Sequence, residues 1–471
     1  MRTKPSKPAQ SSAPKFTIRM YCHGLGDCFL VSIPQKDQER PFWLMIDAGV
    51  LLGTSNGANR MKAVMNSIAA TTGGKIDLLV VTHQHWDHVS GFSYAQQEFR
   101  KLKIDKVWYA WTEDPADELG VELQRTHSKA AFAIEKALHL MDDSSKLRQG
   151  ITDLMTSFGV DGKKSVSNSE VKGSLDTEGA MKLPGKLHPV EYRKPGETIE
   201  LAGVNFHILG PPRDERIFRS DPSKKASEVY EQPSGKVHAF GLGRSMGMIE
   251  AVDGIRDEKD DKLTRPFDTQ HCQKLQAIHK HYPNYSLKSE EWRTIDNDWE
   301  GIVEQLALQL DSDTNNTSLV FAIEIPDSQK VLLFAADAQV GNWLSWHDQT
   351  WTVKAGDKER TMTATDLLNR TVFYKVGHHG SHNATLREKG LELMTSPNLH
   401  AMIPVEVEMA RKKKWFEMPL DVLVARLKEK TKGHVAQADD PKTFTGPFRP
   451  STELNTFVTP NRPLHVELDI E

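Results

Sequence analysis

Residues 82–91 read THQHWDHVSG, and this stretch decides the fold. It follows the mostly apolar residues 76–81, which predict a buried strand. Its polar side chains therefore lie in the loop at the carboxyl end of a strand, where α/β proteins carry their chemistry. They are His83, His85, Asp87 and His88. A polar surface loop is the alternative, but only 19 of the 471 residues are histidines, and burying three of them beside a carboxylate calls for a cation. The stretch predicts a metal site.

Three further segments repeat the same form, an apolar strand followed at once by polar residues. They are WLMID (43–47), VLLFAAD (331–337) and VFYKVGHH (372–379). Strands hold their ends rigidly, so this repetition favours several loops aimed at one centre from a sheet.

The order of these motifs resembles that of the metallo-β-lactamase superfamily. Five segments are similar to the metallo-β-lactamase-like domain of ComEC-type competence proteins: GLGDCFLV (24–31), MIDAG (45–49), NNTSLV (315–320), LLFAADA (332–338) and KVGHHGS (375–381). The resemblance implies an α/β fold, the metallo-β-lactamase αββα sandwich, with helical and loop insertions. It also implies a stand-alone domain, because the chain lacks the membrane portion of the full competence channel.

The resemblance also implies a two-metal centre. Its metal ligands would be His83, His85, Asp87, His88, Asp337 and His378, with Asp87 and His379 in catalytic roles. Either histidine of the 378/379 pair could be the ligand. Further candidate site residues are Asp27, Asp47, Asn315, Asn316 and Ser381. The expected cofactor is one or two divalent ions, Zn²⁺ first, with Mn²⁺, Mg²⁺ or Fe²⁺ as alternatives.

The first of the two sites lacks one expected histidine. The superfamily supplies a third histidine to the metal held by His83 and His85, and no such motif occurs between Gly91 and Asp337. Asn315 or Asn316, or water, would complete the shell. Because a neutral amide is a weak ligand, we expect the second site to bind its metal more tightly.

Two dications would present a bridging hydroxide as nucleophile and clamp an anionic oxygen. We therefore expect a metal-dependent hydrolase, with a phosphodiesterase or nuclease acting on DNA favoured by the resemblance. A hydrolase of a small ester, lactone, thioester or cyclic nucleotide is the alternative. A non-enzymatic regulatory module of the same fold is a third hypothesis, which the near-complete ligand set disfavours.

Charge gives only local support for nucleic-acid binding. The net charge of −4 provides no general attraction to phosphates. One basic cluster precedes Trp415 and could bind a nucleic-acid backbone beside a stacking aromatic residue; it consists of Arg411, Lys412, Lys413 and Lys414. A solvated loop before a helix is the alternative interpretation.

Composition predicts a cytoplasmic protein with no membrane segment. Mean hydropathy is −0.51, and no apolar run approaches 18 residues. The three cysteines suit a reducing compartment. We expect a disordered basic tail over 1–15, a catalytic domain over 16–440 with insertions near 112–190 and 212–300, and a C-terminal extension over 441–471. No sequence feature identifies a protein partner or an oligomeric state.

Overall fold

Two sheets are built from strands that are buried on both faces. In β1 (Phe16–Tyr21), Ile18 and Met20 turn to one face and Tyr21 turns to the other. Successive side chains of a strand point to opposite faces, so a strand of this kind must lie between two apolar layers. The computed structural model describes residues 15–36, 38–141, 145–160, 175–218, 228–230, 281–282, 298–355, 358–458 and 460–471.

The first sheet has eight strands in the order β18-β21-β1-β2-β3-β5-β7-β8. Besides β1, these are β2 (Phe29–Ile33), β3 (Phe42–Ile46), β5 (Leu78–Val80), β7 (Val107–Ala110), β8 (Val190–Arg193), β18 (Phe448–Pro450) and β21 (His465–Ile470). The strands from β3 to β8 run parallel, whereas β1 pairs antiparallel with both of its neighbours.

The second sheet has seven strands in the order β17-β16-β15-β12-β11-β10-β9. They are β9 (Thr198–Leu201), β10 (Val204–Gly210), β11 (Val320–Ile325), β12 (Lys330–Phe334), β15 (Thr371–Lys375), β16 (His400–Ile403) and β17 (Val435–Gln437). Three short pairs complete the strands: β4 (Lys75–Ile76) with β6 (Lys103–Ile104), β13 (Thr350–Ala355) with β14 (Lys358–Thr363), and β19 (Leu454–Asn455) with β20 (Arg462–Pro463).

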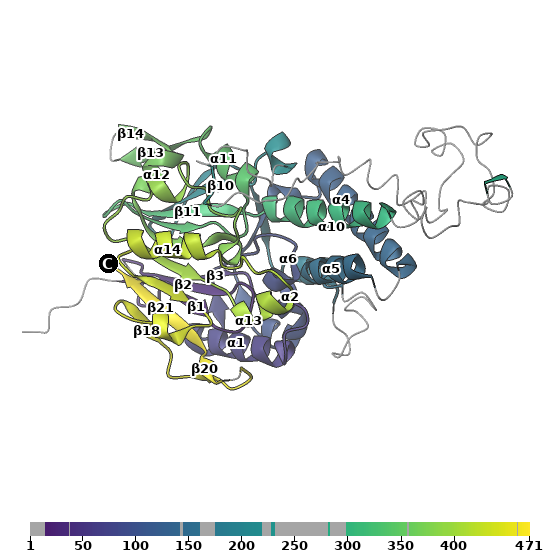
Figure 1. Cartoon of the computed structure of the whole chain (residues 1–471). Coiled ribbons are helices and arrows are strands. Elements are labelled where there is room, and N and C mark those ends of the chain that lie inside the picture. The colour runs from purple at the N-terminus through teal and green to yellow at the C-terminus, as the bar shows by residue number, and fades with distance from the viewer. Residues whose placement is uncertain are drawn as a thin grey trace, which may run out of the picture.

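The two sheets pack face to face on an aromatic core. Phe29 of the first sheet meets Phe334 of the second, and the rings of Phe321 and Phe334 stack with centroids 5.3 Å apart. The outer faces are covered by helices: α1 (Gly57–Thr72), α2 (Trp86–Tyr94) and α6 (Thr177–Leu187) on the first sheet, and α11 (Val340–Trp346), α12 (Ala364–Asn369) and α14 (Asp421–Lys430) on the second. This is the expected αββα sandwich, seen edge-on in Figure 1.

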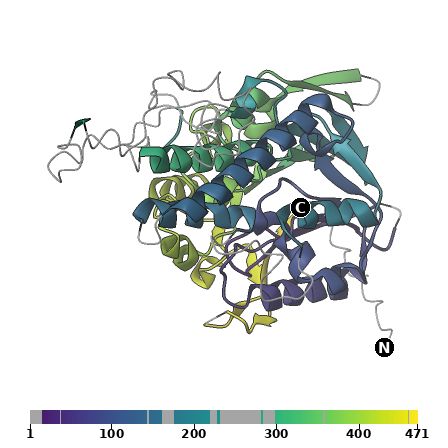
Figure 2. The ribbon, with the colours of Figure 1, turned by 90° about the vertical axis from the view of Figure 1, so that its right-hand side faces the viewer.

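A third helical group lies beside the sandwich. It consists of α4 (Glu118–Leu140), α5 (Lys146–Met155) and α10 (Asp298–Asn316), which share a small apolar core of their own. Figure 2 shows α4 and α10 running side by side, in agreement with their contacts. The short helices α3 (Gln96–Phe99) and α13 (Val407–Lys412) are the remaining α-helices of the residues that the structure describes. The expected insertion near 112–190 thus supplies α4, α5 and α6.

Residues 441–471, expected as a C-terminal extension, contribute strands to the first sheet, because β21 pairs with β1 along its whole length and β18 pairs with β21. The alternating residues Val466, Leu468 and Ile470 of β21 pack into the core between the sheets. The strand is too short for its sequence to have indicated this role. The expected tail before residue 15 and most of the expected 212–300 insertion lie outside the described residues. Within the described part of the chain, every helix is too short or too polar to span a bilayer.

The polar strand ends meet at one edge of the sandwich. The loop after β3 contacts the loop after β5 through backbone hydrogen bonds from Ala48 N–H to the His88 carbonyl (2.9 Å) and from Gly91 N–H to the Ala48 carbonyl (2.7 Å). Gly49 makes this approach possible, because a Cβ there would lie 2.1 Å from the carbonyl carbon of Asp87. The glycine of MIDAG is therefore required by the contact between the two loops.

Replacing Gly49 with alanine should destabilise the fold by about 1–3 kcal/mol or more, because the methyl group overlaps the backbone of the His85–His88 loop. Chemical denaturation would measure the change. Gly301→Ala is the matched control: Gly301 lies within α10 with nothing within 4 Å of an added Cβ, so it should be neutral or stabilising by about 0.5–1 kcal/mol. Equal stability of Gly49→Ala and the wild type would contradict this account of the loop contact.

Candidate metal centre

The histidine-rich loop joins β5 to α2. His83 follows the strand, His85 occupies the N-cap position of the helix, and Asp87 and His88 lie in its first turn. All four side chains are buried. His83 Nε2 and His85 Nδ1 lie 3.2 Å apart, so these two nitrogens face the same point. This is the pair that the sequence assigns to the first metal.

Asp47 fixes the orientation of His88. Its carboxylate accepts hydrogen bonds from Thr82 N–H (2.8 Å) and the Thr82 hydroxyl (2.7 Å), and its Oδ2 lies 2.8 Å from His88 Nδ1. With Nδ1 held by the carboxylate, only Nε2 of His88 is directed toward the centre. Asp47 is therefore placed to orient a ligand rather than to bind metal itself.

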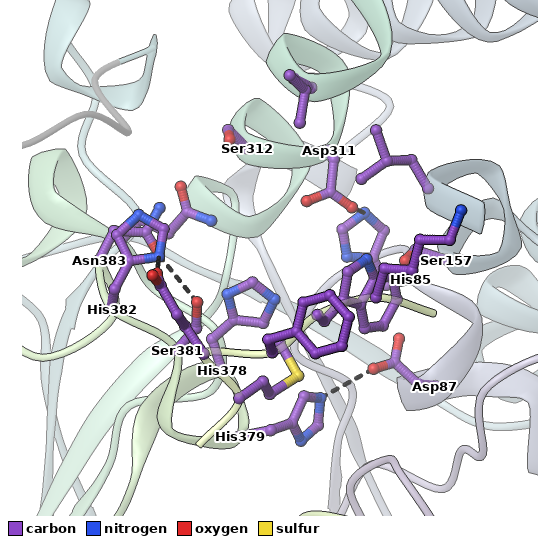
Figure 3. A pocket seen from close by; sticks show the side chains of 18 residues that line it. His85, Asp87, Ser157, Asp311, Ser312, His378, His379, Ser381, His382 and Asn383 are labelled. Carbon is purple, nitrogen blue, oxygen red and sulfur yellow. Dashed lines mark hydrogen bonds and ion pairs between the residues drawn. The ribbon is translucent and has the colours of Figure 1, made fainter. Parts of the chain in front are cut away.

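The second group of candidate ligands converges on two carboxylates. His88 Nε2 lies 3.0 Å from Asp337 Oδ2, and His379 Nε2 lies 2.9 Å from Asp87 Oδ2 and 3.6 Å from Asp337 Oδ2. Figure 3 shows Asp87 and His379 facing each other at the base of the pocket. These four side chains come from α2 and from the loops that follow β12 and β15, as the strand-end pattern predicted.

The pair His378 and His379 is divided between two positions. His379 faces the carboxylates, while its Nδ1 lies 2.7 Å from the Pro404 carbonyl. His378 lines the pocket, and its buried Nδ1 has no hydrogen-bond partner among the described residues. Of the two alternatives that the sequence left open, this geometry favours His379 as the ligand and His378 as the residue that meets substrate. Sequence spacing could not separate two adjacent histidines in one turn.

Both histidines have left-handed backbone conformations, with φ 41° at His378 and φ 52° at His379. Asp47 and Ala336 share this conformation, with φ 53° and φ 46°. Each costs a residue other than glycine roughly 1 kcal/mol or more, and such residues cluster at functional sites. The strain at three of the strand ends supports a functional centre at this edge.

Lys375 is a site residue that the sequence analysis did not assign. Its ammonium is buried and lies 2.5 Å from Asp27 Oδ2 and 3.2 Å from Asp337 Oδ1. Asp27, His88, Asp337 and His379 offer ligand atoms within 4.8 Å of one another. The Asp27 carboxylate, however, lies 3.9 Å from His88 Nδ1 and 3.7 Å from His379 Nδ1. It therefore faces the ring nitrogens that point away from Asp87. We therefore assign Asp27 to Lys375 rather than to a metal.

Asn315 and Asn316, the candidate ligands of the first metal, lie at the end of helix α10. Asn316 Oδ1 accepts hydrogen bonds from Gln339 N–H (3.1 Å) and Asn342 N–H (3.4 Å) at the start of α11, which is a structural role. Asn315 Nδ2 donates to Asp311 Oδ2 at 3.3 Å. Ser381 lines the pocket beside His378.

Asp311 is the second residue that sequence reasoning missed. It lies one helical turn before Asn315 and lines the pocket with His85 (Figure 3), with its Oδ1 3.8 Å from His85 Nε2. Burial, and then the charges of Asp87 and Asp337, raise the pKa of Asp311 to about 8. The spacing of Asp311 and Asn315 would have placed both on one helix face, had the segment been predicted as a helix.

The electrostatics of the centre suit a cation. Burial lowers the pKa of His83 well below its usual value and that of His85 to about 3, so both rings are neutral and offer a lone pair. Burial also acts to lower the pKa of His88, but Asp337, Asp27 and two further carboxylates outweigh it and raise that pKa well above normal. A proton on His88 balances the surrounding negative charge, and a bound dication would take over that role.

Asp87 and Asp337 are ionised. Burial acts to raise the pKa of Asp87, but the positive charge of His88 and the hydrogen bond from His379 outweigh burial and lower this pKa to about 2. The pKa of Asp337 is likewise held well below normal, with Lys375 contributing. Buried atoms without a hydrogen-bond partner among the described residues include Asp87 Oδ1 and His85 Nε2. Neutral imidazoles, charged carboxylates and unpaired buried atoms together fit a divalent metal centre.

The candidate centre opens into a cavity of about 380 Å³. Its wall is partly apolar, with Leu154, Leu308, Trp415, Phe416 and Met418, and Lys414 is the basic residue of the 411–414 cluster that lines it. Two further lysines of that cluster have acidic partners: Lys412 pairs with Glu408 at 2.9 Å and Lys413 pairs with the buried Asp153 at 3.4 Å. The cluster is therefore not a free basic stripe.

A match to a protein-family model agrees with this fold. Residues 42–136, from β3 into α4, match the family model described as the Metallo-beta-lactamase superfamily. Among matching solved structures is the metallo-beta-lactamase fold protein YhfI from Bacillus subtilis, 11% identical, with a TM-score of 0.19, covering 42% of this chain and 52% of that chain. The matched region thus spans about half of YhfI. A search of curated proteins found no match. The family match and the two-sheet architecture confirm the expected fold class.

Histidine substitutions separate the two members of the tandem pair. His379→Ala should lose about one equivalent of bound metal, because His379 faces both Asp87 and Asp337. His378→Ala should retain the metal content of the wild type, since its ring points into the pocket. Elemental analysis of dialysed protein measures both. Metal loss in His378→Ala together with full retention in His379→Ala would restore the assignment made from the sequence.

Proposed function

We propose that this protein is a metal-dependent phosphodiesterase, and within that class a nuclease, that acts in the cytoplasm. The observation that carries the proposal is the convergence of four imidazoles and two ionised carboxylates at one edge of an αββα sandwich; they are His83, His85, Asp87, His88, Asp337 and His379. Divalent ions held there would activate water near neutral pH and polarise a phosphoryl oxygen.

The surrounding residues support an anionic ester as substrate. His378 is neutral because burial lowers its pKa to about 4, so it can donate a hydrogen bond to an oxygen in the pocket without adding charge. Lys414 supplies positive charge at the pocket wall. The Oδ1 atom of Asp337 is held by Lys375, which leaves Oδ2 as the oxygen directed toward both His88 and His379. Both rings belong to the second group of candidate ligands, so this oxygen would serve as a ligand at the second metal site.

The aromatic wall supports a substrate with a flat group. Phe416 is 75% exposed and lines the pocket with Trp415, so a base could stack there while its phosphate lies at the metals. The motifs NNTSLV, LLFAADA and KVGHHGS, which resemble ComEC-type domains, support a nucleic acid as the source of that base.

A second candidate is hydrolysis of a small ester, lactone, thioester or cyclic nucleotide. The cavity of about 380 Å³ with its apolar wall favours it, since this volume is within the range of small-molecule sites. The pairing of Lys412 and Lys413 with acidic residues also weakens the case for an extended nucleic-acid groove.

Turnover of bis-p-nitrophenyl phosphate and of single-stranded DNA, with Zn²⁺, Mn²⁺ or Mg²⁺, tests the proposal. Asp337→Ala should lower both activities by more than about a hundredfold, because it removes a ligand rather than an outer partner. Lys414→Gln should weaken kcat/KM for DNA about fivefold, equivalent to roughly 1 kcal/mol, and flatten its salt dependence. Lys412→Gln is the matched control, since Lys412 is paired with Glu408 and does not line the pocket.

The two candidates give different outcomes. A wild-type protein that cleaves a lactone or thioester but no phosphodiester with any of the three metals would establish the second. A neutral substrate would also leave turnover by Lys414→Gln unchanged, because no phosphate charge is present for the lysine to attract.

A further inference from the structure

His85 has one nitrogen directed to the first metal position and one directed away from it. Its Nδ1 lies 3.2 Å from His83 Nε2, the contact that a metal between the two rings would replace. Its Nε2 is buried and has no hydrogen-bond partner among the described residues. The carboxylate oxygen within 4 Å of that atom is Asp311 Oδ1, at 3.8 Å.

Metal binding dictates where the proton of this ring must be. A neutral imidazole carries one proton, so a metal on Nδ1 of His85 forces the proton onto Nε2. A buried N–H without an acceptor is costly, and the cost would oppose metal binding. An acceptor beside Nε2 removes that cost and fixes the ring in the tautomer that the metal requires.

A hydrogen bond within helix α10 orients the Asp311 side chain. Asn315 Nδ2 donates to Asp311 Oδ2 at 3.3 Å, four residues along α10, which leaves Oδ1 facing His85. The 3.8 Å separation of these two atoms exceeds hydrogen-bond length, so the proposed bond requires the Asp311 side chain to rotate toward His85 when metal binds. Helix α10 itself is fixed by packing Val303, Leu306 and Leu310 against α4 and α5.

We propose that Asp311 is the positioning residue of the first metal site: its Oδ1 accepts a hydrogen bond from the Nε2–H group of His85 and so leaves Nδ1 as the metal-binding atom. In this chain the motif NNTS then acts on the first site through Asn315 and Asp311, not as a ligand. The inference rests on the proposed metal-dependent function, because it concerns the same centre.

Metal binding to the metal-stripped protein tests the role without any substrate. Zn²⁺ is titrated in competition with a chromophoric chelator, and Co²⁺ is titrated with its visible absorption recorded. In Asp311→Ala, one equivalent should bind about 10–100-fold more weakly than in the wild type, with the other unchanged. Asp311→Asn keeps an acceptor oxygen and should recover much of the loss. The shape of the Co²⁺ spectrum should stay as in the wild type, because no ligand is removed.

Asp313→Asn is the matched control. It removes a buried carboxylate from the same helix, but Asp313 points to a different helix face. Its Oδ1 accepts a hydrogen bond from Gln309 Nε2 at 2.6 Å. It should bind both equivalents as the wild type does, and thermal unfolding of the stripped variants verifies that each is folded.

The outcomes separate this inference from the proposed function. If the wild type binds two equivalents of metal and the Asp311→Ala variant binds both with the same affinity, the role of Asp311 is overturned but the metal-dependent function is not. A Co²⁺ spectrum whose band positions, or whose intensity per bound ion at saturation, change in Asp311→Ala would make Asp311 a ligand and would also overturn the positioning role. A wild type that binds no metal overturns the metal-dependent function itself.

Discussion

The buried carboxylate of Asp47 is the constraint on which the centre depends. It holds Thr82 at the end of β5 and His88 in the first turn of α2, and so fixes how the histidine-rich loop leaves the sheet. An unpaired carboxylate at this depth would be costly, so its three hydrogen bonds form together. Because they form, His88 can direct only one nitrogen inward, and the rest of the ligand geometry follows from that direction.

The negative charge of the centre is partly offset in two layers. Lys375 pairs with Asp27 and with one oxygen of Asp337 behind the ligands, and the protonated His88 offsets part of the remaining negative charge in front. A centre of this kind resists burial unless each charge has a partner. Lys375 keeps its charge whether or not metal is bound, whereas a bound metal would replace the proton on His88.

The strand-end motifs could be predicted from the sequence because each element carries its own local signal. Apolar runs before Asp47, His83, Asp337 and His379 gave the strands and the edge at which they end, and the αββα fold followed from the family resemblance. Asp311 and Lys375 could not be placed in this way. Asp311 reaches the site only through the packing of α10 on α4 and α5, and the partner of Lys375 lies 348 positions earlier, information that no local pattern contains.

The pairing of β21 with β1 has a consequence for how the chain is made. Arg19 and Glu467, which face each other across these strands, are separated by 448 positions. At ordinary rates of synthesis, the partner of β1 follows it by on the order of tens of seconds. During that interval β1 has an open edge, which is a template for pairing with other chains. Protection of the nascent edge, by a chaperone or by early packing of β2 and β3, is therefore part of what this topology demands from the cell.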